Sequence, residues 1–322
     1  MNKTQTGKIR RVTITLETII LRRPLTRTKM MFRNVRYYQF DSGWPKSEEL
    51  LSQALETAHF KPCGPLTERS SGWVAVHQDA GDLLARRVNA ADLFKLRSQS
   101  RVLPPAAVNE ELDVRIDDYQ ARMGEAPSGR EKRRLKAEAR DELMPKALLK
   151  SDRIWGYVDP EMGIIGIDAA QSTVAERFLR RLSAAVTLSD VRPLQFNKPI
   201  GELLTKIFLG GAPAQFGLGR ECRMQDAADS GSIVRWSNFD LSDSTIRNHV
   251  ADGMRLTHLG IEYANVMACV IDENGVISKV RFLGMDDDKT DELEPLARLD
   301  AEFVLITGTL RALVADLRKL LQ

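Results

Sequence analysis

Side chains that could support metal or acid–base chemistry occur in this chain of 322 residues, but their spacing matches no catalytic pattern. Its four histidines follow neither an HExxH motif nor the ligand spacing of a zinc site, and we expect each of them to be structural. Asp168, Glu262 and Asp272 could converge on a metal ion, although nothing in their spacing requires it. Gly217-Leu218-Gly219 lacks the third glycine of a dinucleotide loop, and no GxxxxGK[ST] phosphate loop occurs. We therefore expect no catalysis, no metal and no cofactor.

The stretch from Arg130 to Arg153 has the chemistry needed to bind phosphate. It carries nine basic and five acidic residues, a net charge of +4. Lys132, Lys136 and Arg140 recur every four residues, so a helix would place them on one face. The alternative is a solvated helix with pairs between its own charges, since attraction and repulsion are mixed at these spacings. On residues alone the two interpretations stay open.

The charge of the whole chain is unevenly distributed. Its net charge is +3, but residues 1–30 contain eight basic side chains and one acid, a charge of +7, which leaves −4 from Met31 onward. A nucleic-acid-binding protein with an acidic body must gather its cations locally, because phosphate contacts need a local basic surface. A transit peptide, a nucleic-acid-binding arm and a misassigned start all fit residues 1–30, and we expect a misassigned start or a disordered tail.

Composition predicts a soluble protein of the cytoplasm. Apolar residues make up 43% of the chain and charged residues 28%, which is ordinary for a globular protein. The three cysteines are scattered, which fits a reducing compartment. No apolar run approaches the roughly 18 residues of a membrane span.

The elements that would position the cations alternate between strands and helices. A strand over 32–40, a helix over 46–58 and strands over 72–76 and 92–103 precede Pro104-Pro105. Gly124 is expected to end one helix, and a second begins at Arg130, which together form a two-helix arm. Arg97 and Arg101 share a face of the strand before that arm.

The second half of the chain repeats this alternation. We expect a hairpin over 154–159 and 163–168, a helix containing Phe178, a strand over 191–196 and a helix over 200–209. The order of strands and helices is similar before and after the arm, so we expect the two halves to share one sheet.

The stretch from Ile233 to Tyr263 reads as strand, helix and strand, with Ser242 as the helix N-cap and Gly253 as its stop. Asn274-Gly275 predicts a hairpin, and a mainly helical segment over 293–321 should break at Gly308. The predicted class is α+β, with mixed or antiparallel sheets and flanking helices. The predicted parts are a basic extension (1–30), a central domain (31–103 and 151–196), the arm (104–150), a base domain (197–290) and a C-terminal helical segment (291–322).

An ordered set of short strings runs from about Met31 to the C-terminus. It includes Phe60-Lys61-Pro62-Cys63-Gly64, Asn197-Lys198-Pro199-Ile200, Asp240-Leu241-Ser242, Asn248-His249 and Phe303-Val304-Leu305-Ile306-Thr307-Gly308. No single string is a strong motif, but the set and its order resemble the bacterial recombination-associated protein RdgC family.

The resemblance implies a function without catalysis or cofactor. Members of that family are α+β proteins whose two protomers form a ring-shaped homodimer with a positively lined hole. They bind double-stranded DNA with little sequence preference, act in the nucleoid and are thought to limit access of the recombinase RecA to DNA. In such a protein the two-helix arm forms the tip of each protomer.

Two departures from the family pattern affect the expected DNA contacts. Lys146 stands where relatives often carry arginine, and Leu148 stands where they carry an aromatic residue, which puts any stacking or docking role at that tip in doubt. Asn238 lacks the charge of the lysine that relatives can carry there. The residues expected to contact phosphate are Lys132, Arg133, Lys136, Arg140, Lys146, Arg235 and Arg247. The alternatives are a metal-dependent nuclease or other DNA-processing enzyme, and an interaction scaffold without DNA affinity.

Overall fold

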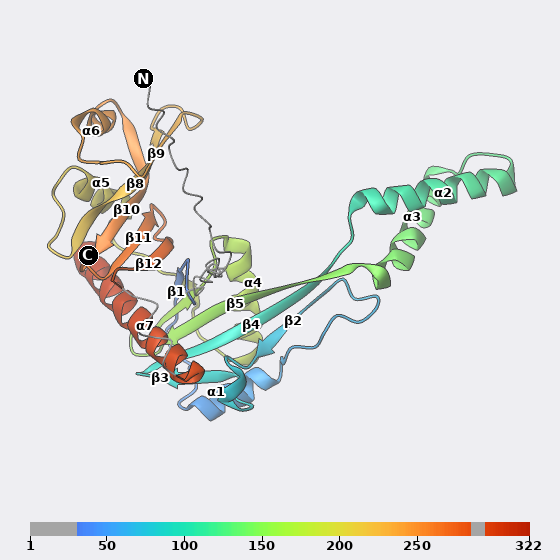
Figure 1. The fold of residues 1–322 in the computed structure, drawn as a ribbon, viewed down its shortest axis with the longest axis horizontal. Coiled ribbons are helices and arrows are strands. Elements are labelled where there is room, and N and C mark those ends of the chain that lie inside the picture. The colour runs from blue at the N-terminus through green and yellow to red at the C-terminus, as the bar shows by residue number, and fades with distance from the viewer. Residues whose placement is uncertain (1–30, 285–293) are drawn as a thin grey trace, which may run out of the picture. The chain divides into compact units, whose positions relative to one another are not determined.

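The computed structural model describes residues 31–284 and 294–322. The chain divides into Met1–Met30 and Met31–Gln322, and only the second unit is described below, so the expectation for residues 1–30 lies outside the described residues. This unit has the predicted α+β class, with two antiparallel sheets and seven α-helices among the residues described (Figure 1).

The larger sheet has seven strands in the order β2-β4-β5-β6-β1-β7, with β3 also paired to β4. Their bounds are β1 Arg36–Gln39, β2 Arg69–Val74, β3 Ala85–Val88, β4 Ala91–Val102, β5 Leu148–Asp159, β6 Ile164–Ile167 and β7 Arg192–Pro193. Strands from before and after the arm meet in this one sheet, as the order of elements predicted. The strand expected over 191–196 shrinks to two residues, since Pro193 has no N–H to donate to a ladder.

The core of this sheet lies on the face covered by α1 (Glu48–Glu56) and α4 (Ser172–Ala185). The ring of Trp73 meets that of Phe178 edge-on at 5.2 Å, and Phe94 stacks on Phe178 at 5.6 Å. Close packing leaves no room for a side chain at Gly156, where a Cβ would lie 2.2 Å from Cζ of Phe178. The sequence alternation of β4 therefore directs its aromatic residue into a dense interior.

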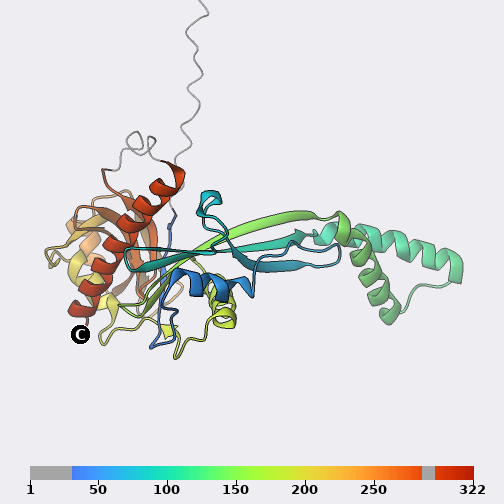
Figure 2. The same cartoon turned by 90° about the horizontal axis from the view of Figure 1, so that it is seen from below.

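Two helices, α2 (Pro105–Met123) and α3 (Gly129–Leu143), form the predicted helical hairpin between β4 and β5. Figures 1 and 2 both show β4 and β5 running side by side into these helices. Gly124 ends α2 in the left-handed conformation (φ 75°), and Ser128 and Glu131 form a capping box at the start of α3. A small core of Leu112, Tyr119 and Leu135 joins the helices.

The strand after the hairpin begins earlier than the sequence predicts. A short 3-10 turn, η2 (Met144–Lys146), follows α3, and β5 starts at Leu148 rather than at Ile154. Its first residues pair with the end of β4, from Val102 opposite Leu148 to Arg97 opposite Arg153. Strand β5 begins earlier because its first residues pair with β4, which is distant in the sequence. This pairing satisfies backbone N–H and C=O groups for which the local sequence predicts no partner.

The smaller sheet has five strands in the order β12-β11-β10-β8-β9. The bounds are β8 Phe216–Asp226, β9 Ile233–Ser237, β10 Met254–Tyr263, β11 Met267–Asp272 and β12 Ile277–Phe282, with helices α5 Ile200–Phe208 and α6 Ser244–Ala251. Strand β10 has the predicted bounds, and Gly253 before it has a φ of +96°. The N-cap of α6 is Asp243 and not Ser242, because the Asp243 carboxylate accepts from the Thr245 amide at 2.8 Å.

The last helix, α7 (Pro295–Leu320), contacts residues of both sheets. Its Phe303 ring packs on Tyr157 of β5, and Asp316 accepts a hydrogen bond of 2.7 Å from the Tyr263 hydroxyl of β10. The predicted break at Gly308 is wrong, because the helix runs through this exposed position while the apolar face that includes Phe303, Ile306 and Leu310 is buried. Burial of the helix face outweighs the roughly 1 kcal/mol cost of a helical glycine. Among the described helices, none has the length and apolarity to cross a membrane.

Candidate nucleic-acid interface

The predicted arm cations lie on the exposed side of α3. Lys132, Lys136 and Arg140 are exposed, whereas Leu135 and Ala139 of the same helix are buried against α2. The spacing of four residues therefore does place the three cations on one side of the helix, as the sequence predicts. This set, with Arg133 beside it, is called the α3 stripe below.

Most cations of this region already have a polar partner. Lys136 Nζ donates to Asn109 Oδ1 at 3.1 Å, the guanidinium of Arg140 pairs with the Glu68 carboxylate, and Arg133 Nε donates to the Gly129 carbonyl. Lys146 lies 3.6 Å from Glu142. These groups are solvent-exposed, and exposed pairs contribute only about 0–1 kcal/mol, so a phosphate can replace such a partner at little cost.

Arg235 belongs to a second group of cations, on the five-stranded sheet. It is exposed on β9 directly opposite Arg223 of β8, and Arg223 lies opposite His258 of β10. Burial lowers the pKa of His258, and Arg223 and Arg235 lower it further, while Asp272 and Glu273 raise it. His258 is therefore held toward its neutral form beside two fixed positive charges.

Arg247 does not join that row. Helix α6 packs against the face of β9 that carries Trp236, whose ring lies 5.0 Å from that of His249. Because neighbouring strand residues point to opposite faces, Arg235 leaves from the other side of the sheet. The Nε atoms of Arg223 and Arg247 are both buried without an acceptor among the described residues. The two predicted phosphate contacts, Arg235 and Arg247, thus lie on opposite faces of the five-stranded sheet.

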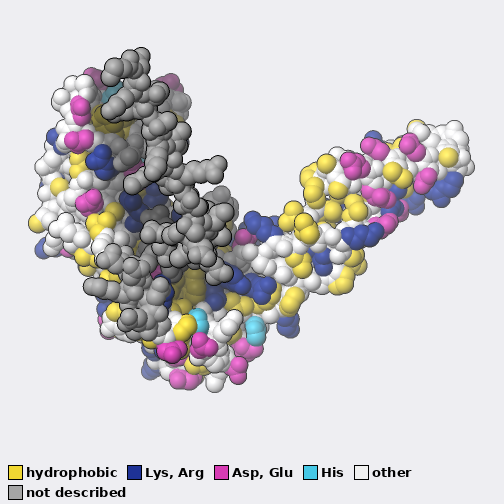
Figure 3. All heavy atoms as spheres, in the orientation of Figure 1, with side chains coloured by type: hydrophobic (Ala, Val, Ile, Leu, Met, Phe, Trp, Pro, Cys, Tyr) yellow, Lys and Arg dark blue, Asp and Glu magenta, His cyan; other side chains and the backbone are white. Residues whose placement is uncertain are grey.

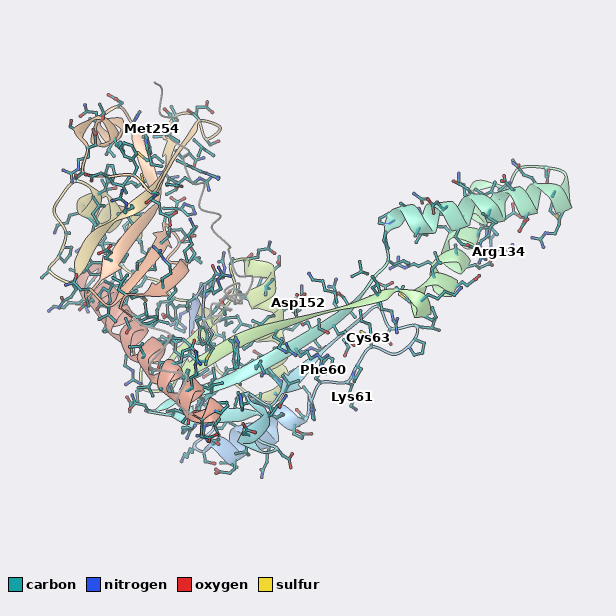
Figure 4. All side chains as sticks on the ribbon, in the orientation of Figure 1. Phe60, Lys61, Cys63, Arg134, Asp152 and Met254 are labelled. Atoms are coloured by element: carbon teal, nitrogen blue, oxygen red, sulfur yellow. The ribbon has the colours of Figure 1, made fainter. Side chains whose placement is uncertain are left out.

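A third group of cations lies on β4 and β5 and was not among the expected contacts. Arg97 of β4 is directly opposite Arg153 of β5, and Lys95 is opposite Trp155. Figure 3 shows Lys and Arg side chains gathered over these two strands, and Figure 4 shows Phe60 beside them. Lys95, Arg97 and Arg101 are separated by even numbers of residues, and this spacing predicts that they share one face of a strand. The contribution of Arg153 from β5 depends on the register between the two strands, which the sequence does not display.

Arg101, although on the same face, has a structural role. Its guanidinium donates to the Gly64 carbonyl at 3.1–3.2 Å and to the carbonyls of Met144, Pro145 and Ala147 at 3.1–3.3 Å. These bonds hold η2 and the loop before β2 against the end of β4. The donors of this side chain are already used, so it has few left for a ligand.

Two of the three acids that could have bound a metal already accept hydrogen bonds from backbone amides. Asp168 accepts hydrogen bonds from the backbone amides of Arg33 at 3.1 Å and Asn34 at 2.8 Å. Asp272 accepts from the amides of the turn that follows β11. Within residues 31–284 and 294–322, no three His, Cys, Asp or Glu side chains are grouped as metal ligands.

The fold and these surfaces define an α+β protein of two antiparallel sheets that carries three separate groups of cations. A family model described as "Putative exonuclease, RdgC" matches residues 30–322. The chain belongs to this RdgC family, which confirms the resemblance found in the sequence.

Curated relatives cover nearly the same span. The chain is similar to the "Recombination-associated protein RdgC" of Psychromonas ingrahamii, with 25% identity over 88% of this chain and 96% of the relative. The proteins of that name from Aeromonas hydrophila and Halorhodospira halophila are 28% and 29% identical, each over 89% of this chain and 96% of the relative.

Proposed function

We propose that this protein binds double-stranded DNA without sequence preference and acts in recombination, as a ring-shaped homodimer that limits access of the recombinase RecA to DNA in the nucleoid. The observation that carries the proposal is the α3 stripe, an exposed set of cations on a chain whose net charge from Met31 onward is −4. The name of its relatives supports the role in recombination.

Binding through such cations has no means of reading base sequence. Lysine and arginine contacts to phosphate fix the position of a protein on DNA, whereas sequence is read at the base edges. A closed homodimer adds topological retention, which needs no base contact. Local groups of cations let a protein with an acidic body bind phosphate where those groups lie.

Exposed apolar residues at the far ends of β4 and β5 support contact between copies of the chain. Leu148 is 79% exposed, and Leu149 and Val102 beside it are also exposed. Grouped exposed apolar side chains often mark a protein–protein contact. Since they lie next to η2, a second copy would meet the protein near its helical hairpin.

Titration of fluorescent duplexes tests the proposal. Two 30-bp duplexes of unrelated sequence are expected to bind with equal affinity, and if about 6–10 phosphates are contacted the affinity should fall ~10³–10⁵-fold between 50 and 200 mM salt. A strong preference for one duplex, or no complex at 50 mM salt, would contradict it.

The second candidate is a nuclease, which the description of the family model favours. Supercoiled plasmid and a linear duplex labelled at its end are incubated with the protein and Mg²⁺ or Mn²⁺. A binding protein leaves both intact, whereas an exonuclease shortens the linear duplex. Loss of the end label in proportion to protein concentration would favour the nuclease.

A further inference from the structure

We propose that Lys95, Arg97 and Arg153 form a binding site for the phosphodiester backbone of DNA on the seven-stranded sheet, with Phe60 and Trp155 as its apolar floor. The proposal rests on the proposed function and adds to it a site outside the helical hairpin. It is called the β4–β5 site below.

The register of the two strands brings the three cations together. Arg97 and Arg153 are a directly opposed pair, and Lys95 is two residues from Arg97 on the same face of β4. The other face of these strands carries Phe94 and Leu96 into the core with α1 and α4. The cationic face is therefore the one that these helices leave uncovered.

Two aromatic rings hold the cations in place. The guanidinium carbon of Arg97 lies 4.5 Å from the centroid of the Phe60 ring, and Lys95 Nζ lies 4.7 Å from that of Trp155. Lys95 Nζ also donates to the Val76 carbonyl at 2.7 Å. Stacking on a ring fixes a flexible cation without neutralising it, which lowers the entropy lost when a ligand binds.

The group lacks negative charge. Within the described residues, none of the three cations is in an ion pair, whereas Lys150 on the other face of β5 lies 3.5 Å from the Asp152 carboxylate. Arg97 makes a hydrogen bond of 3.4 Å to Ser151 Oγ, and its Nε has no acceptor in the part of the chain described. Burial and then the charge of Arg153 lower the pKa of Lys95 to about 8.

Several cations without acidic partners on one face of the sheet match a polyanion as the ligand. Adjacent same-face positions of a strand are roughly 7 Å apart, and Arg153 lies beside Arg97 on the neighbouring strand, so the three cations are spread over the face of the sheet. Guanidinium groups match phosphate geometry, and cations spread over a sheet face suit a chain of phosphates better than one small anion. Such contacts carry no base information, in keeping with binding of any sequence.

The test compares Arg153→Gln with Lys150→Gln, which removes one positive charge from the opposite face of the same strand. A fluorescent 30-bp duplex is titrated at salt concentrations from 50 to 200 mM. Arg153→Gln is expected to weaken binding about tenfold and to reduce the slope of log affinity against log salt by about 1, whereas Lys150→Gln leaves both unchanged.

Two further measurements keep the outcomes distinct. Arg153→Lys keeps the charge and is expected to restore the slope, while thermal unfolding verifies that all three variants fold. If the Arg153→Gln variant binds duplex DNA with the same affinity and salt slope as the wild type, the β4–β5 site is overturned while the proposed function stands. Failure of the wild-type protein to bind duplex at 50 mM salt would overturn both.

Discussion

The surroundings of Lys95 disfavour the charged form of its side chain. Lys95 is partly buried against Trp155, which lies directly opposite it, and Arg153 is its diagonal neighbour on the same face of β5. Its hydrogen bond goes to the neutral carbonyl of Val76. Burial and like charge both disfavour the ammonium form, which is why its pKa falls to about 8. A phosphate placed nearby would reverse this effect and raise the pKa.

This leads to a prediction about pH. Lys95 carries its charge below its pKa and loses it above, so DNA affinity should fall as the pH rises from about 8 to 10. Because DNA raises the pKa of Lys95, binding at about pH 8.5 should take up a proton. Affinity measured at constant salt, together with calorimetry in two buffers of different ionisation enthalpy, provides the check. Lys95→Arg should remove most of this pH dependence, and an unchanged profile in that variant would count against a role for Lys95.

Replacement of glycine by alanine is predicted to have opposite effects on the free energy of unfolding at two positions. Gly156→Ala should destabilise the protein by about 1–3 kcal/mol or more, because the new Cβ would lie 2.2 Å from the Phe178 ring in a packed core. Gly129→Ala is the control, since open space surrounds that position at the start of α3, and it should stabilise by about 0.4–1 kcal/mol. Urea denaturation measures both. Equal effects of the two substitutions would contradict the packing described here.

At the scale of elements, α3 combines a polar exterior with a narrow apolar stripe. Its capping box and the hydrogen bond of 2.7 Å from the Tyr119 hydroxyl to Glu131 fix its start. Tyr119 and Leu135 fix its side against α2. These contacts do not involve the α3 stripe, so its cations can be changed without loss of the hairpin.

The combined variant Lys132→Glu, Lys136→Glu and Arg140→Glu should therefore fold and bind duplex DNA more weakly. Removal of about three phosphate contacts should reduce the slope of log affinity against log salt by roughly 3. Circular dichroism checks the helix content. An unchanged slope would remove the α3 stripe from the DNA-binding surface.

Arg134→Glu is the matched control for that variant. Arg134 is on the same helix but outside the stripe, where it pairs with Glu138 at 3.6 Å. Its reversal should change the affinity less than any single reversal within the stripe. A larger effect would place the DNA on a different side of α3.

For the whole molecule, the exposed ends of β4 and β5 matter most. We expect a homodimer at micromolar concentration, and Leu148→Asp should weaken it because a charge would have to be buried in an apolar contact. Leu209→Asp, at a residue 50% exposed after α5, is the control. Sedimentation velocity measures both. A ring of two copies is closed by two contacts, so the dimer dissociation constant is measured as well. Equal sedimentation coefficients together with equal dissociation constants for the Leu148→Asp variant and the wild type would exclude this contact.

Local signals in the sequence were sufficient where one residue decides the conformation. Gly124 and Gly253 end helices because they adopt a positive φ at little cost, and both positions were predicted. The α3 stripe follows from helical periodicity alone. Even there, the N-cap of α6 was wrong by one residue, because Asp243 and Ser242 are both good caps and only geometry separates them.

The sequence by itself determined the class of fold, the helical hairpin with its cationic side and the membership of the RdgC family. Only the tertiary structure decided that α7 continues through Gly308, that Arg101 binds backbone carbonyls and that Arg97 meets Arg153. Periodicity is a property of neighbouring residues, so a sequence displays it directly. Register between strands and burial of a helix face depend on residues far apart in the chain, and their free energy is fixed only when the sheets form.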